Sequence, residues 1–236
     1  MILCLDAGNT RLKWGLREGR AWRAQGACAL DDIGGIAALL PAVSEHILAC
    51  NVAGDAVATR IEDIVAPFGV PLAWFRSSAS CCGVLNGYDN PAQLGADRWA
   101  ALVGARGVHT GDALVVVAGT ATTIDVLAAD GRFRGGLILP GLELMQKALA
   151  RNTAGLPEAR GAYRDLPTNT DDAIVSGALQ ATLGAIERMA CRLAQTDFRA
   201  ILSGGAAEAL APHLDLPQLR VDNLVLEGLA RAAARC

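Results

Sequence analysis

A short pattern occurs twice in this chain, about half the chain apart, and it restricts the folds open to the sequence. An apolar run at residues 2–5 ends on an acid, a turn of small residues with a threonine follows, and a second run covers 12–16. Residues 113–127 repeat the apolar run, the small turn with threonine and the second run. The repeat predicts an α/β protein with two similar halves of βββαβα type, residues 1–110 and 111–236.

The first turn combines residue types that suit a metal-bound phosphate. Asp6 closes the apolar run, and Gly8 and Asn9 accept positive φ in a two-residue hairpin. Backbone N–H groups of such a turn and the hydroxyl of Thr10 can face phosphate oxygens, while Asp6 can hold a metal ion or its waters. Lys13 adds a positive charge. An ordinary N-terminal hairpin that ends on an acid stays open as the alternative.

The bulk composition argues against several classes of protein. With 236 residues, 52% of them hydrophobic and 4% aromatic, the chain can bury a large aliphatic core typical of layered α/β proteins. A net charge of -3 with scattered basic residues argues against a nucleic-acid surface. The sequence contains neither an apolar run long enough to span a membrane nor the features of a signal peptide, so we expect a cytoplasmic protein.

The cysteines occur without the spacing of a metal site. In a cytoplasmic protein we expect all of them to be reduced thiols, and most of them to be small fillers of the core. The adjacent pair is also open to a redox role, which we favour less. The cysteines are Cys4, Cys28, Cys50, Cys81, Cys82, Cys191 and Cys236.

The rest of the chain alternates between strand-like and helix-like stretches. Beyond the two repeats, we expect strands at residues 21–29, 46–52, 71–75, 133–139 and 198–202. We expect helices at residues 30–40 behind an aspartate N-cap, and at 55–68, 91–108, 140–149, 173–193, 206–210 and 224–235. Two such halves resemble the duplicated fold of actin, sugar kinases and heat-shock chaperones. In that fold a nucleotide lies in the cleft between the halves, and each half contributes a phosphate hairpin.

Four ordered motifs make the resemblance more specific. They are DAGNT at residues 6–10, GADR at 95–98, GTATTID at 119–125 and GGLILPG at 135–141. In order and spacing, over nearly the whole chain, they resemble the motif series of type III pantothenate kinases, and the Bvg accessory factor subgroup is especially similar. The resemblance implies an acetate and sugar kinase-like ATPase fold and ATP-dependent phosphorylation of pantothenate, the first step of coenzyme A biosynthesis. It also implies homodimers, Mg2+ and a monovalent cation, K+ or NH4+.

The resemblance assigns roles to residues by position. Asp97 would be the general base that takes the proton of the substrate hydroxyl. The first ATP-phosphate loop would comprise Asp6, Ala7, Gly8, Asn9, Thr10, Arg11, Leu12 and Lys13, with Thr120 in the second loop. Pantothenate would be bound by Tyr88, Gly95, Ala96, Asp97, Arg98 and Thr170.

The chemistry of these residue types agrees with that assignment. Phosphoryl transfer needs positioning and neutralisation of charge. Because Mg2+ uses few carboxylates, Asp6 can anchor the ion through water, with Asp125 as a second candidate. Asp97 can accept the hydroxyl proton, and the guanidinium of Arg98 suits a carboxylate on the substrate.

Each residue also has an ordinary structural explanation. Asp97 and Arg98 can be a charged pair on a helix surface. Asp125 can close a hairpin, and Tyr88 can pack half-buried with its hydroxyl in water. Thr170 can be only the N-cap of the helix that follows it.

One position departs from the family pattern. The family usually has an aspartate two residues before the glycine of the Gly119-Thr120 motif, as a monovalent-cation ligand, but here that residue is Val117. An aliphatic side chain cannot bind K+. The cation can therefore be replaced, held by backbone carbonyls, or absent. The departure also leaves open a regulatory or accessory protein of the same fold with weak or no kinase activity. A kinase of the same fold for another hydroxyl substrate, such as a sugar, is a further alternative. Tyr88 and Arg98 favour a substrate that carries a carboxylate over a neutral sugar.

Overall fold

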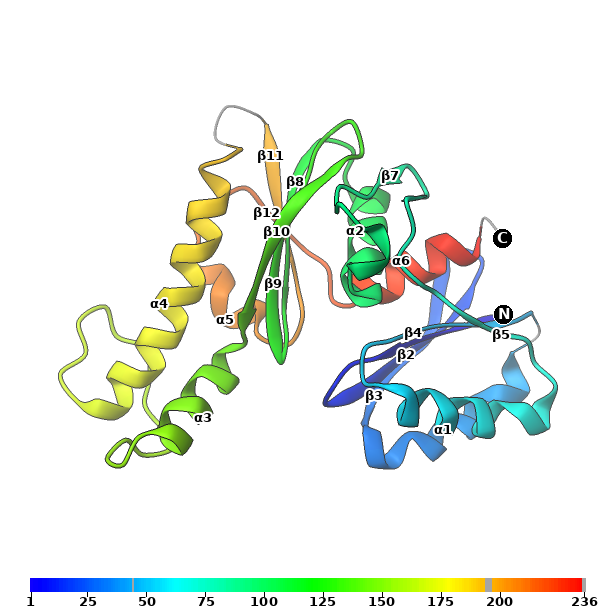
Figure 1. The fold of residues 1–236 in the computed structure, drawn as a ribbon, viewed down its shortest axis with the longest axis horizontal. Helices are drawn as coiled ribbons and strands as arrows, with labels where there is room; N and C mark the ends of the chain where they lie inside the picture. The colour runs from blue at the N-terminus through cyan, green and yellow to red at the C-terminus, as the bar shows by residue number, and fades with distance from the viewer. Residues whose placement is uncertain (44, 194–196, 235–236) are drawn as a thin grey trace. The chain divides into compact units, whose positions relative to one another are not determined.

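The computed structural model describes residues 1–43, 45–193 and 197–234, and these form two compact units (Figure 1). Unit 1 comprises Met1–Thr110, Gly131–Phe133 and residues 223–234. Unit 2 comprises Gly111–Asp130 and Arg134–Asp222. In the described parts of the chain, no helix is long and apolar enough to cross a membrane.

Unit 1 is built on a five-stranded sheet with the order β3-β2-β1-β4-β5. β1–β2 and β2–β3 are antiparallel, as expected of consecutive hairpins, whereas β1–β4 and β4–β5 are parallel. The central strands β1 and β4 are buried nearly throughout because they are almost entirely apolar, as parallel strands with both faces covered are. The strands are β1 (Ile2–Ala7), β2 (Arg11–Glu18), β3 (Ala21–Ala29), β4 (Ile47–Asn51) and β5 (Leu72–Trp74).

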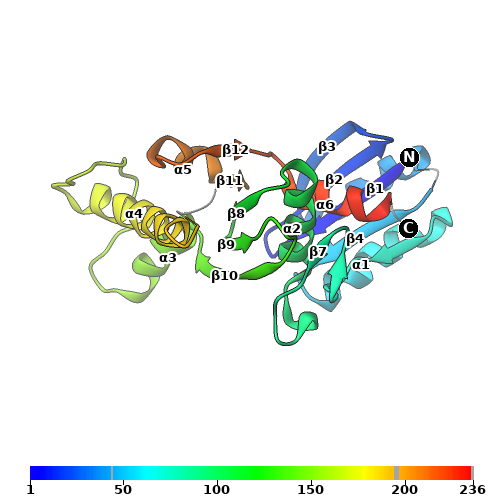
Figure 2. The same ribbon diagram turned by 90° about the horizontal axis from the view of Figure 1, so that it is seen from above.

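Helices cover both faces of this sheet. They are the 3-10 helix η1 (Leu30–Ala42), α1 (Asp55–Val65), its extension η2 (Ala66–Phe68), α2 (Ala96–Val108) and α6 (Leu224–Ala233). Leu3, Leu5 and Ala7 of β1 share an apolar core with residues of η1 and α1. Cys4 and Asp6 alternate with them and face the opposite side. On that side α2 and α6 pack against each other and against the sheet (Figure 2). The alternation in β1 therefore directs Asp6 toward the side that α2 occupies.

The predicted helix at residues 30–40 differs from the structure in type and in its start. It forms the 3-10 helix η1, and its N-cap is Ala29, which makes no side-chain capping bond, rather than an aspartate. Two glycines and Pro41 lie inside η1. Glycine and proline both disfavour an α-helical interior, which accounts for the tighter, irregular helix.

The predicted helix at residues 91–108 is interrupted. A short 3-10 helix, η3 (Pro91–Gln93), is followed by Leu94 and Gly95 in extended conformation, and α2 starts only afterwards. A two-stranded hairpin, β6 (Ser80–Cys81) and β7 (Val84–Leu85), lies just before it and was not predicted. Strands of two residues are too short to give a periodic signal.

Unit 2 repeats the sheet of unit 1. Its order is β10-β9-β8-β11-β12, with β8–β9 antiparallel and β8–β11 and β11–β12 parallel. This match confirms the duplicated α/β architecture that the repeated pattern predicts. The strands are β8 (Asp112–Ala118), β9 (Ala121–Leu127), β10 (Phe133–Pro140), β11 (Phe198–Ser203) and β12 (Gln218–Arg220).

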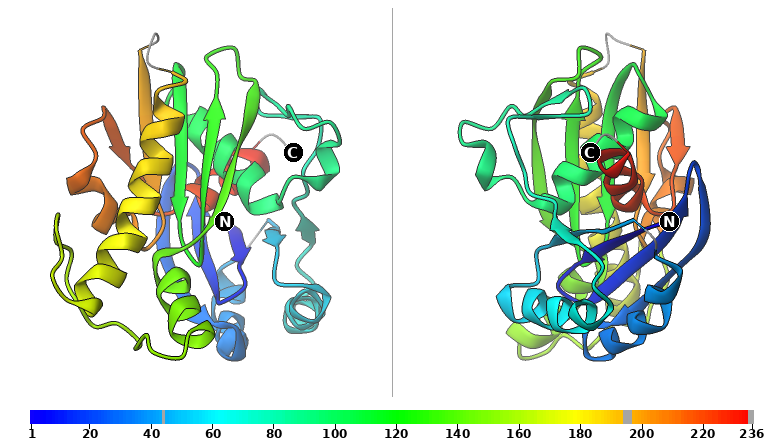
Figure 3. Two further views of the ribbon diagram at one scale, coloured as in Figure 1. Left: turned by 60° about the vertical axis from the view of Figure 1, so that its left-hand side comes forward. Right: turned by 90° about the vertical axis from the view of Figure 1, so that its right-hand side faces the viewer.

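One face of this second sheet is covered by α4, which lies along it in Figure 3. The helices of unit 2 are α3 (Leu142–Asn152), α4 (Thr170–Ala190), α5 (Ala207–Leu210) and the 3-10 helix η4 (Ala211–His213). Leu114, Val116 and Ala118 of β8 share an apolar core with Leu179 and Leu183 of α4. The intervening residues of β8 face the other side of the sheet, as in β1.

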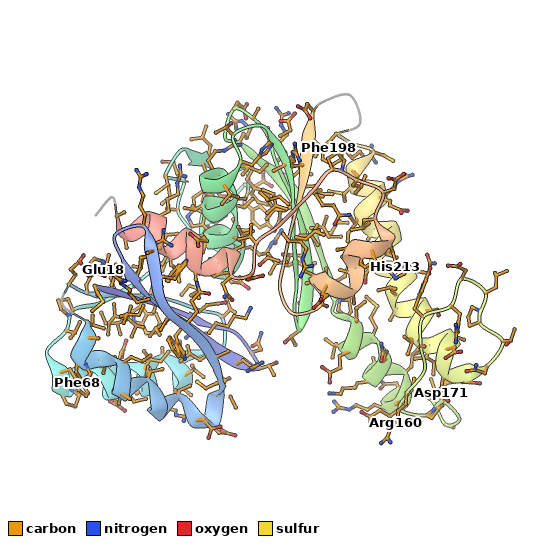
Figure 4. All side chains as sticks on the ribbon, turned by 180° about the vertical axis from the view of Figure 1, so that it is seen from behind. Glu18, Phe68, Arg160, Asp171, Phe198 and His213 are labelled. Carbon is orange, nitrogen blue, oxygen red and sulfur yellow. The ribbon has the colours of Figure 1, made fainter. Side chains whose placement is uncertain are left out.

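The segment between α3 and α4 returns to the N-terminus of α4. The backbone N–H of Arg160 donates to Oδ1 of Asp171 at 2.9 Å, and these two residues are labelled in Figure 4. The N–H of Ala162 donates to Oδ1 of Asp172 at 2.8 Å. These bonds hold residues 160–162 against the first turn of α4.

The closing helix α6 belongs to unit 1, although it follows unit 2 in the sequence and the division at residue 110 places it in the other half. Its Gly228 lies against α2 so closely that a Cβ there would overlap the carbonyl oxygen of Ala100. The predicted end of this helix, Arg235, and also Cys236 lie outside the described residues. The other six cysteines are free thiols, as expected.

Candidate active site

The first candidate loop follows β1 in unit 1. Asp6, 7% exposed, lies opposite Lys13 of β2 and beside Cys50 of β4, with all three on one face of the sheet. The Cys50 thiol donates a hydrogen bond to Oδ1 of Asp6 at 3.5 Å. The N–H of Gly8 donates to the carbonyl of Arg11 at 3.1 Å and closes the turn, whose two intervening residues are exposed. The turn thus offers its tip to solvent while its carboxylate is buried.

Burial raises the pKa of Asp6 above the ordinary value of a carboxyl group. The positive charge of Lys13 lowers this pKa, the negative charge of Asp97 raises it, and the hydrogen bond from Cys50 lowers it. The carboxylates of β1 and α2 are therefore within electrostatic reach of each other in unit 1. A divalent cation beside Asp6 would favour its charged form.

Asp97 lies in the first turn of α2 and is half-buried. Its Oδ1 accepts a hydrogen bond from the backbone N–H of Arg98 at 2.8 Å. A Cβ on Gly95 would lie 2.7 Å from the same oxygen, so a residue without a side chain leaves room for the carboxylate. The positive end of the helix dipole favours a negative charge here. The carboxylate is held in one place, as a proton acceptor requires.

Arg98 is buried, with 5% of its surface exposed, and its guanidinium lies beside a stacked pair of aromatic rings. Its guanidinium donates from Nη1 to the hydroxyl of Tyr88 at 2.7 Å and lies 5.6 Å from the centre of that ring and 5.8 Å from that of Phe133. The two rings stack at 5.5 Å. The alternative of an exposed charge pair is therefore wrong for Arg98, and the hydroxyl of Tyr88 has a protein partner.

Phe133 is a residue of this cluster that the sequence analysis missed. It is the first residue of β10, fully buried, and the segment that carries it belongs to unit 1. The N–H of Leu85 donates to the carbonyl of Gly131 at 2.9 Å. Gly131 has a φ of 87°, and a Cβ there would overlap the carbonyl oxygen of Gly83. The only sequence signal was a lone aromatic residue beside a turn glycine.

The loop that carries Tyr88 is organised by Asn86. Its Nδ2 donates to the hydroxyl of Ser77 at 3.0 Å and to the carbonyl of Pro91 at 3.2 Å, and its Oδ1 accepts from the N–H of Tyr88 at 3.0 Å. These bonds position the Tyr88 ring for its contact with Arg98.

The second candidate loop follows β8 in unit 2. Gly119 and Thr120 are exposed, and the N–H of Gly119 donates to the carbonyl of Ala121 at 3.0 Å. The N–H of Gly141 donates to the carbonyl of Thr120 at 2.9 Å, and a Cβ on Gly141 would overlap the carbonyl oxygen of Gly119. The segment that carries Gly141 therefore packs directly against this loop and supports it.

Val117 holds the place in unit 2 that corresponds to Asp6. It lies opposite Thr123 of β9 and beside Ser203 of β11, and the buried Thr123 hydroxyl has no hydrogen-bond partner in the described structure. Asp125, two residues further along β9, is 1% exposed and lies against Gly136, where a Cβ would overlap its Oδ1. It lies within the strand rather than at a hairpin end.

Thr170, predicted to contact the substrate, is the exposed first residue of α4 in unit 2. The alternative that it is the N-cap is wrong. The N-cap is Asn169, whose Oδ1 accepts from the N–H of Asp172 at 2.9 Å. Thr120 and Asp125 also belong to unit 2, and the other predicted site residues belong to unit 1.

The carboxylate of Asp6 fits a cation that takes few protein ligands. Among the described residues, no group of three or more His, Cys, Asp or Glu side chains could hold a metal ion by itself. Mg2+ is commonly bound by one or two carboxylates together with waters and substrate phosphates. The donor set therefore fits Mg2+ that arrives with a nucleotide.

Comparisons with known proteins identify the family. A family model described as type III pantothenate kinase matches residues 2–192. A protein of Aromatoleum aromaticum named type III pantothenate kinase is 54% identical over 237 residues, covering 99% of this chain and 98% of that protein. Another from Dechloromonas aromatica, of the same name, is 46% identical and covers 100% of both. These matches give no support to an accessory protein without kinase activity.

Solved structures show the fold. A candidate 2-dehydro-3-deoxygalactonokinase from Sinorhizobium meliloti superposes with a TM-score of 0.65 at 16% identity, covering 100% of this chain and 99% of that one. A Baf family protein from Campylobacter jejuni, described as a transcriptional activator, gives 0.64 at 20% identity, covering 99% and 98%. The predicted sugar kinase-like ATPase fold is confirmed. The chain belongs to the type III pantothenate kinase family.

Proposed function

We propose that this protein transfers the γ-phosphoryl group of ATP to the primary hydroxyl of pantothenate and so catalyses the first step of coenzyme A biosynthesis. The observation that carries the proposal is the cluster in unit 1. There the Asp97 carboxylate at the start of α2 lies within electrostatic reach of Asp6, and the adjacent Arg98 contacts a stacked pair of aromatic rings. Family membership supplies the substrate class.

In the proposed reaction, Asp97 accepts the proton of the pantothenate hydroxyl while the hydroxyl oxygen forms a bond to the γ-phosphorus. The bond from that phosphorus to the bridging oxygen breaks, and ADP leaves with the electron pair. Arg98 offers a positive charge to the pantothenate carboxylate, and Tyr88 and Phe133 fix its guanidinium plane. Gly95 and Ala96 shape the start of α2 beside the substrate.

The two loops are proposed phosphate-binding elements. In unit 1 the exposed turn after Asp6 presents backbone N–H groups and the Thr10 hydroxyl, with Lys13 nearby, and in unit 2 Thr120 belongs to the supported loop. When bound beside Asp6 through water, Mg2+ would neutralise phosphate charge. Asp125 stays a prediction as a second metal residue, and Thr170 as a substrate residue.

The monovalent cation that the resemblance implies does not fit the residues present. The side chain of Val117 has no oxygen, and those of its neighbours Thr123 and Ser203 are neutral. A cation there would lack the negative charge that offsets the loss of its hydration. We propose no step that uses such an ion.

We also propose that the enzyme is a homodimer in the cytoplasm. α3 has no buried residue, and several large apolar side chains of α3 and the edge strand β10 are exposed. Exposed large apolar side chains are a common feature of protein interfaces. They are Leu137, Ile138, Leu144 and Leu149. Sedimentation of an Ile138→Asp variant, expected to be monomeric, tests this.

The direct test is ATP-dependent formation of 4'-phosphopantothenate by wild type and by Asp97→Asn. We expect kcat to fall by about 10²–10⁴-fold in the variant, the usual contribution of a general base, with ATP affinity retained in calorimetry. Asp89→Asn is the matched control, because Asp89 is an exposed carboxylate in the loop beside Tyr88. Turnover within threefold of wild type in Asp97→Asn would refute the assigned base, and a well-folded wild type without turnover would refute the function.

A further inference from the structure

Two adjacent cysteines, which the proposed reaction does not use, occupy the hairpin between β6 and β7. Cys81 ends β6, and Cys82 and Gly83 form a two-residue turn before Val84, with φ of 51° and 80°. Positive φ at both turn positions is the conformation that Asn-Gly normally fills, and Cys82 is a poor residue for it. The turn holds the two sulfur atoms 3.6 Å apart, where the Cys81 thiol donates to the sulfur of Cys82, and both cysteines are reduced.

Neighbouring segments of unit 1 hold this turn in place. The Cys82 thiol donates to the carbonyl of Arg231 at 3.6 Å, and Nη2 of Arg231 donates to the carbonyl of Cys82 at 3.3 Å. The next residue, Gly83, lies against Gly131. Cys82 is 8% exposed and Cys81 is half-buried, so a ligand reaches the pair from the side of Cys81. The pair is thus a fixed arrangement of two thiols.

The separation of the sulfur atoms fits a shared ligand better than a bond between them. A disulfide requires about 2.05 Å and is normally formed between Cα atoms at least about 4.4 Å apart, whereas adjacent residues are about 3.8 Å apart. Two sulfurs bound at about 2.3 Å to one atom lie roughly 3.3–3.8 Å from each other for bond angles between those of a pyramidal and a tetrahedral centre. The observed 3.6 Å lies in that range.

We propose that Cys81 and Cys82 form a two-thiol binding site for a thiophilic centre with two exchangeable positions, the chemical class of monosubstituted trivalent arsenicals. Four-coordinate ions such as zinc need further ligands, and no cluster of three or more suitable side chains occurs among the described residues. Binding converts R–As(OH)2 and two thiols into R–As(S–Cys)2 and two waters. Two As–S bonds replace two As–O bonds, and no electron is transferred.

Other cysteines compete poorly for such a ligand. Cys4 and Cys50 are fully buried, and burial raises the pKa of Cys4 to about 12 and that of Cys50 well above its ordinary value, so their reactive thiolate forms are scarce. Cys191 is exposed but is not paired with another cysteine in the described structure. It can offer one sulfur only.

The site also has a consequence for catalysis, which rests on the proposed function. The hairpin leads directly into the Tyr88 loop, because the N–H of Asn86 donates to the carbonyl of Ala79 at 2.9 Å and Asn86 holds Tyr88. A ligand on the turn should therefore disturb the ring that contacts Arg98. We expect the KM for pantothenate to rise several-fold, with the KM for ATP unchanged.

The experiment titrates the full chain with phenylarsine oxide and follows binding by native mass spectrometry and by the loss of titratable thiols. We expect one adduct and two lost thiols per wild-type chain, reversed by a dithiol but not by a monothiol. Cys81→Ser and Cys82→Ser should each bind about 10²–10⁴-fold more weakly, because the second thiol no longer acts at high effective concentration. Cys191→Ser is the matched control and should bind as wild type does.

An adduct that persists at wild-type affinity in Cys81→Ser, or a wild type that binds no arsenical, would overturn the site. Cys81→Ala provides the same test if Cys82→Ser fails to fold. An adduct with unchanged pantothenate KM would overturn the coupling to the Tyr88 loop. A wild type that binds the arsenical but phosphorylates nothing would refute the proposed function and leave the site standing.

Discussion

The sheets of the two units share strand order and direction, yet the residues in register at the ends of their first strands differ in chemistry. In unit 1 this row consists of Lys13, Asp6 and Cys50. In unit 2 the corresponding row on β9, β8 and β11 consists of Thr123, Val117 and Ser203. One row carries charges of both signs, and the other carries none.

The comparison shows which positions the duplicated fold fixes. Ala7 and Ala118, the residues that follow Asp6 and Val117, both lie in the apolar cores of their units. The strand alternation then turns Asp6 and Val117 to the opposite face, away from these two apolar clusters. The duplicated fold therefore gives both units a loop at the same place, whereas the charge of the side chains in the row differs between the units. We infer that unit 1 supplies the charged chemistry and unit 2 a neutral loop.

The largest expected effect comes from removing the charge of the unit 1 row. Asp6→Asn should lower kcat/KM by about 10³-fold, because charge neutralisation by the metal is central to phosphoryl transfer. The same variant should be more stable than wild type at neutral pH, since it removes a buried carboxylate. Steady-state kinetics and thermal unfolding measure the two effects. A fall in both activity and stability would contradict the assignment.

The stability effect of Asp6 also has a definite pH dependence. The folded pKa of Asp6 is raised, chiefly by burial, so the folded state binds its proton more tightly than the unfolded state does. Its contribution to the free energy of unfolding is then lost as the pH rises from the ordinary carboxyl pKa through the raised one. The stability advantage of Asp6→Asn over wild type should grow as the pH rises through this range and vanish at lower pH. The groups that face Asp6, which are Lys13, Cys50 and Asp97, are the same in wild type and variant, so the difference between their unfolding curves reports on Asp6.

The next effect tests the cation that unit 1 offers to the substrate. Arg98→Lys should raise the KM for pantothenate by roughly 10²-fold and change kcat little, because lysine keeps the charge but loses the planar fork that contacts Tyr88 and Phe133. Arg76→Lys, at an exposed position, is the control and should behave as wild type. A kcat loss without a KM change would instead place Arg98 in the chemical step.

A smaller effect tests how Gly141 supports the loop at Gly119 and Thr120 in unit 2. Gly141→Ala should destabilise the protein by about 2 kcal/mol and raise the KM for ATP, because a Cβ would displace the carbonyl of Gly119. At Gly119 itself a Cβ would lie 3.6 Å from the Ala121 carbonyl oxygen, an ordinary contact. Gly119→Ala should therefore cost less than about 1 kcal/mol. Chemical denaturation of the pair measures the difference, and equal losses would contradict the support from Gly141.

The sequence predicted what depends on local pattern. Apolar runs located the central strands because burial on two faces restricts residue type strongly. Small-residue turns located both loops, but the predicted reason was wrong, since neither Gly8 nor Asn9 has the positive φ expected of the hairpin. The helix starts were less predictable. Asp31 or Asp32 resembled an N-cap as much as Asn169 does, but only Asn169 makes the capping bond. Which candidate caps a helix depends on tertiary contacts that propensity does not contain.

The site was predictable as motifs and not as contacts. The four motifs located Asp6, Asp97 and Arg98, but no local pattern could place Phe133 over Arg98, since 34 positions separate them and the contact is made by tertiary folding. The departure at Val117 was visible from the sequence. Its neighbours Thr123 and Ser203 became evident only from the strand register.

The smallest expected effect comes from giving the unit 2 row the charge that unit 1 has. Val117 is half-buried, so Val117→Asp should destabilise the protein by about 1 kcal/mol in a buffer whose only cation is choline. Potassium should restore the melting temperature of the variant, because the new carboxylate with the oxygens of Thr123 and Ser203 offers a set of hard ligands. Wild type should melt at the same temperature in choline and in potassium at equal ionic strength. If potassium raised the melting temperature of wild type by the same amount, the neutral row of unit 2 would already bind the cation. The difference in charge between the two rows would then not decide which unit binds a cation.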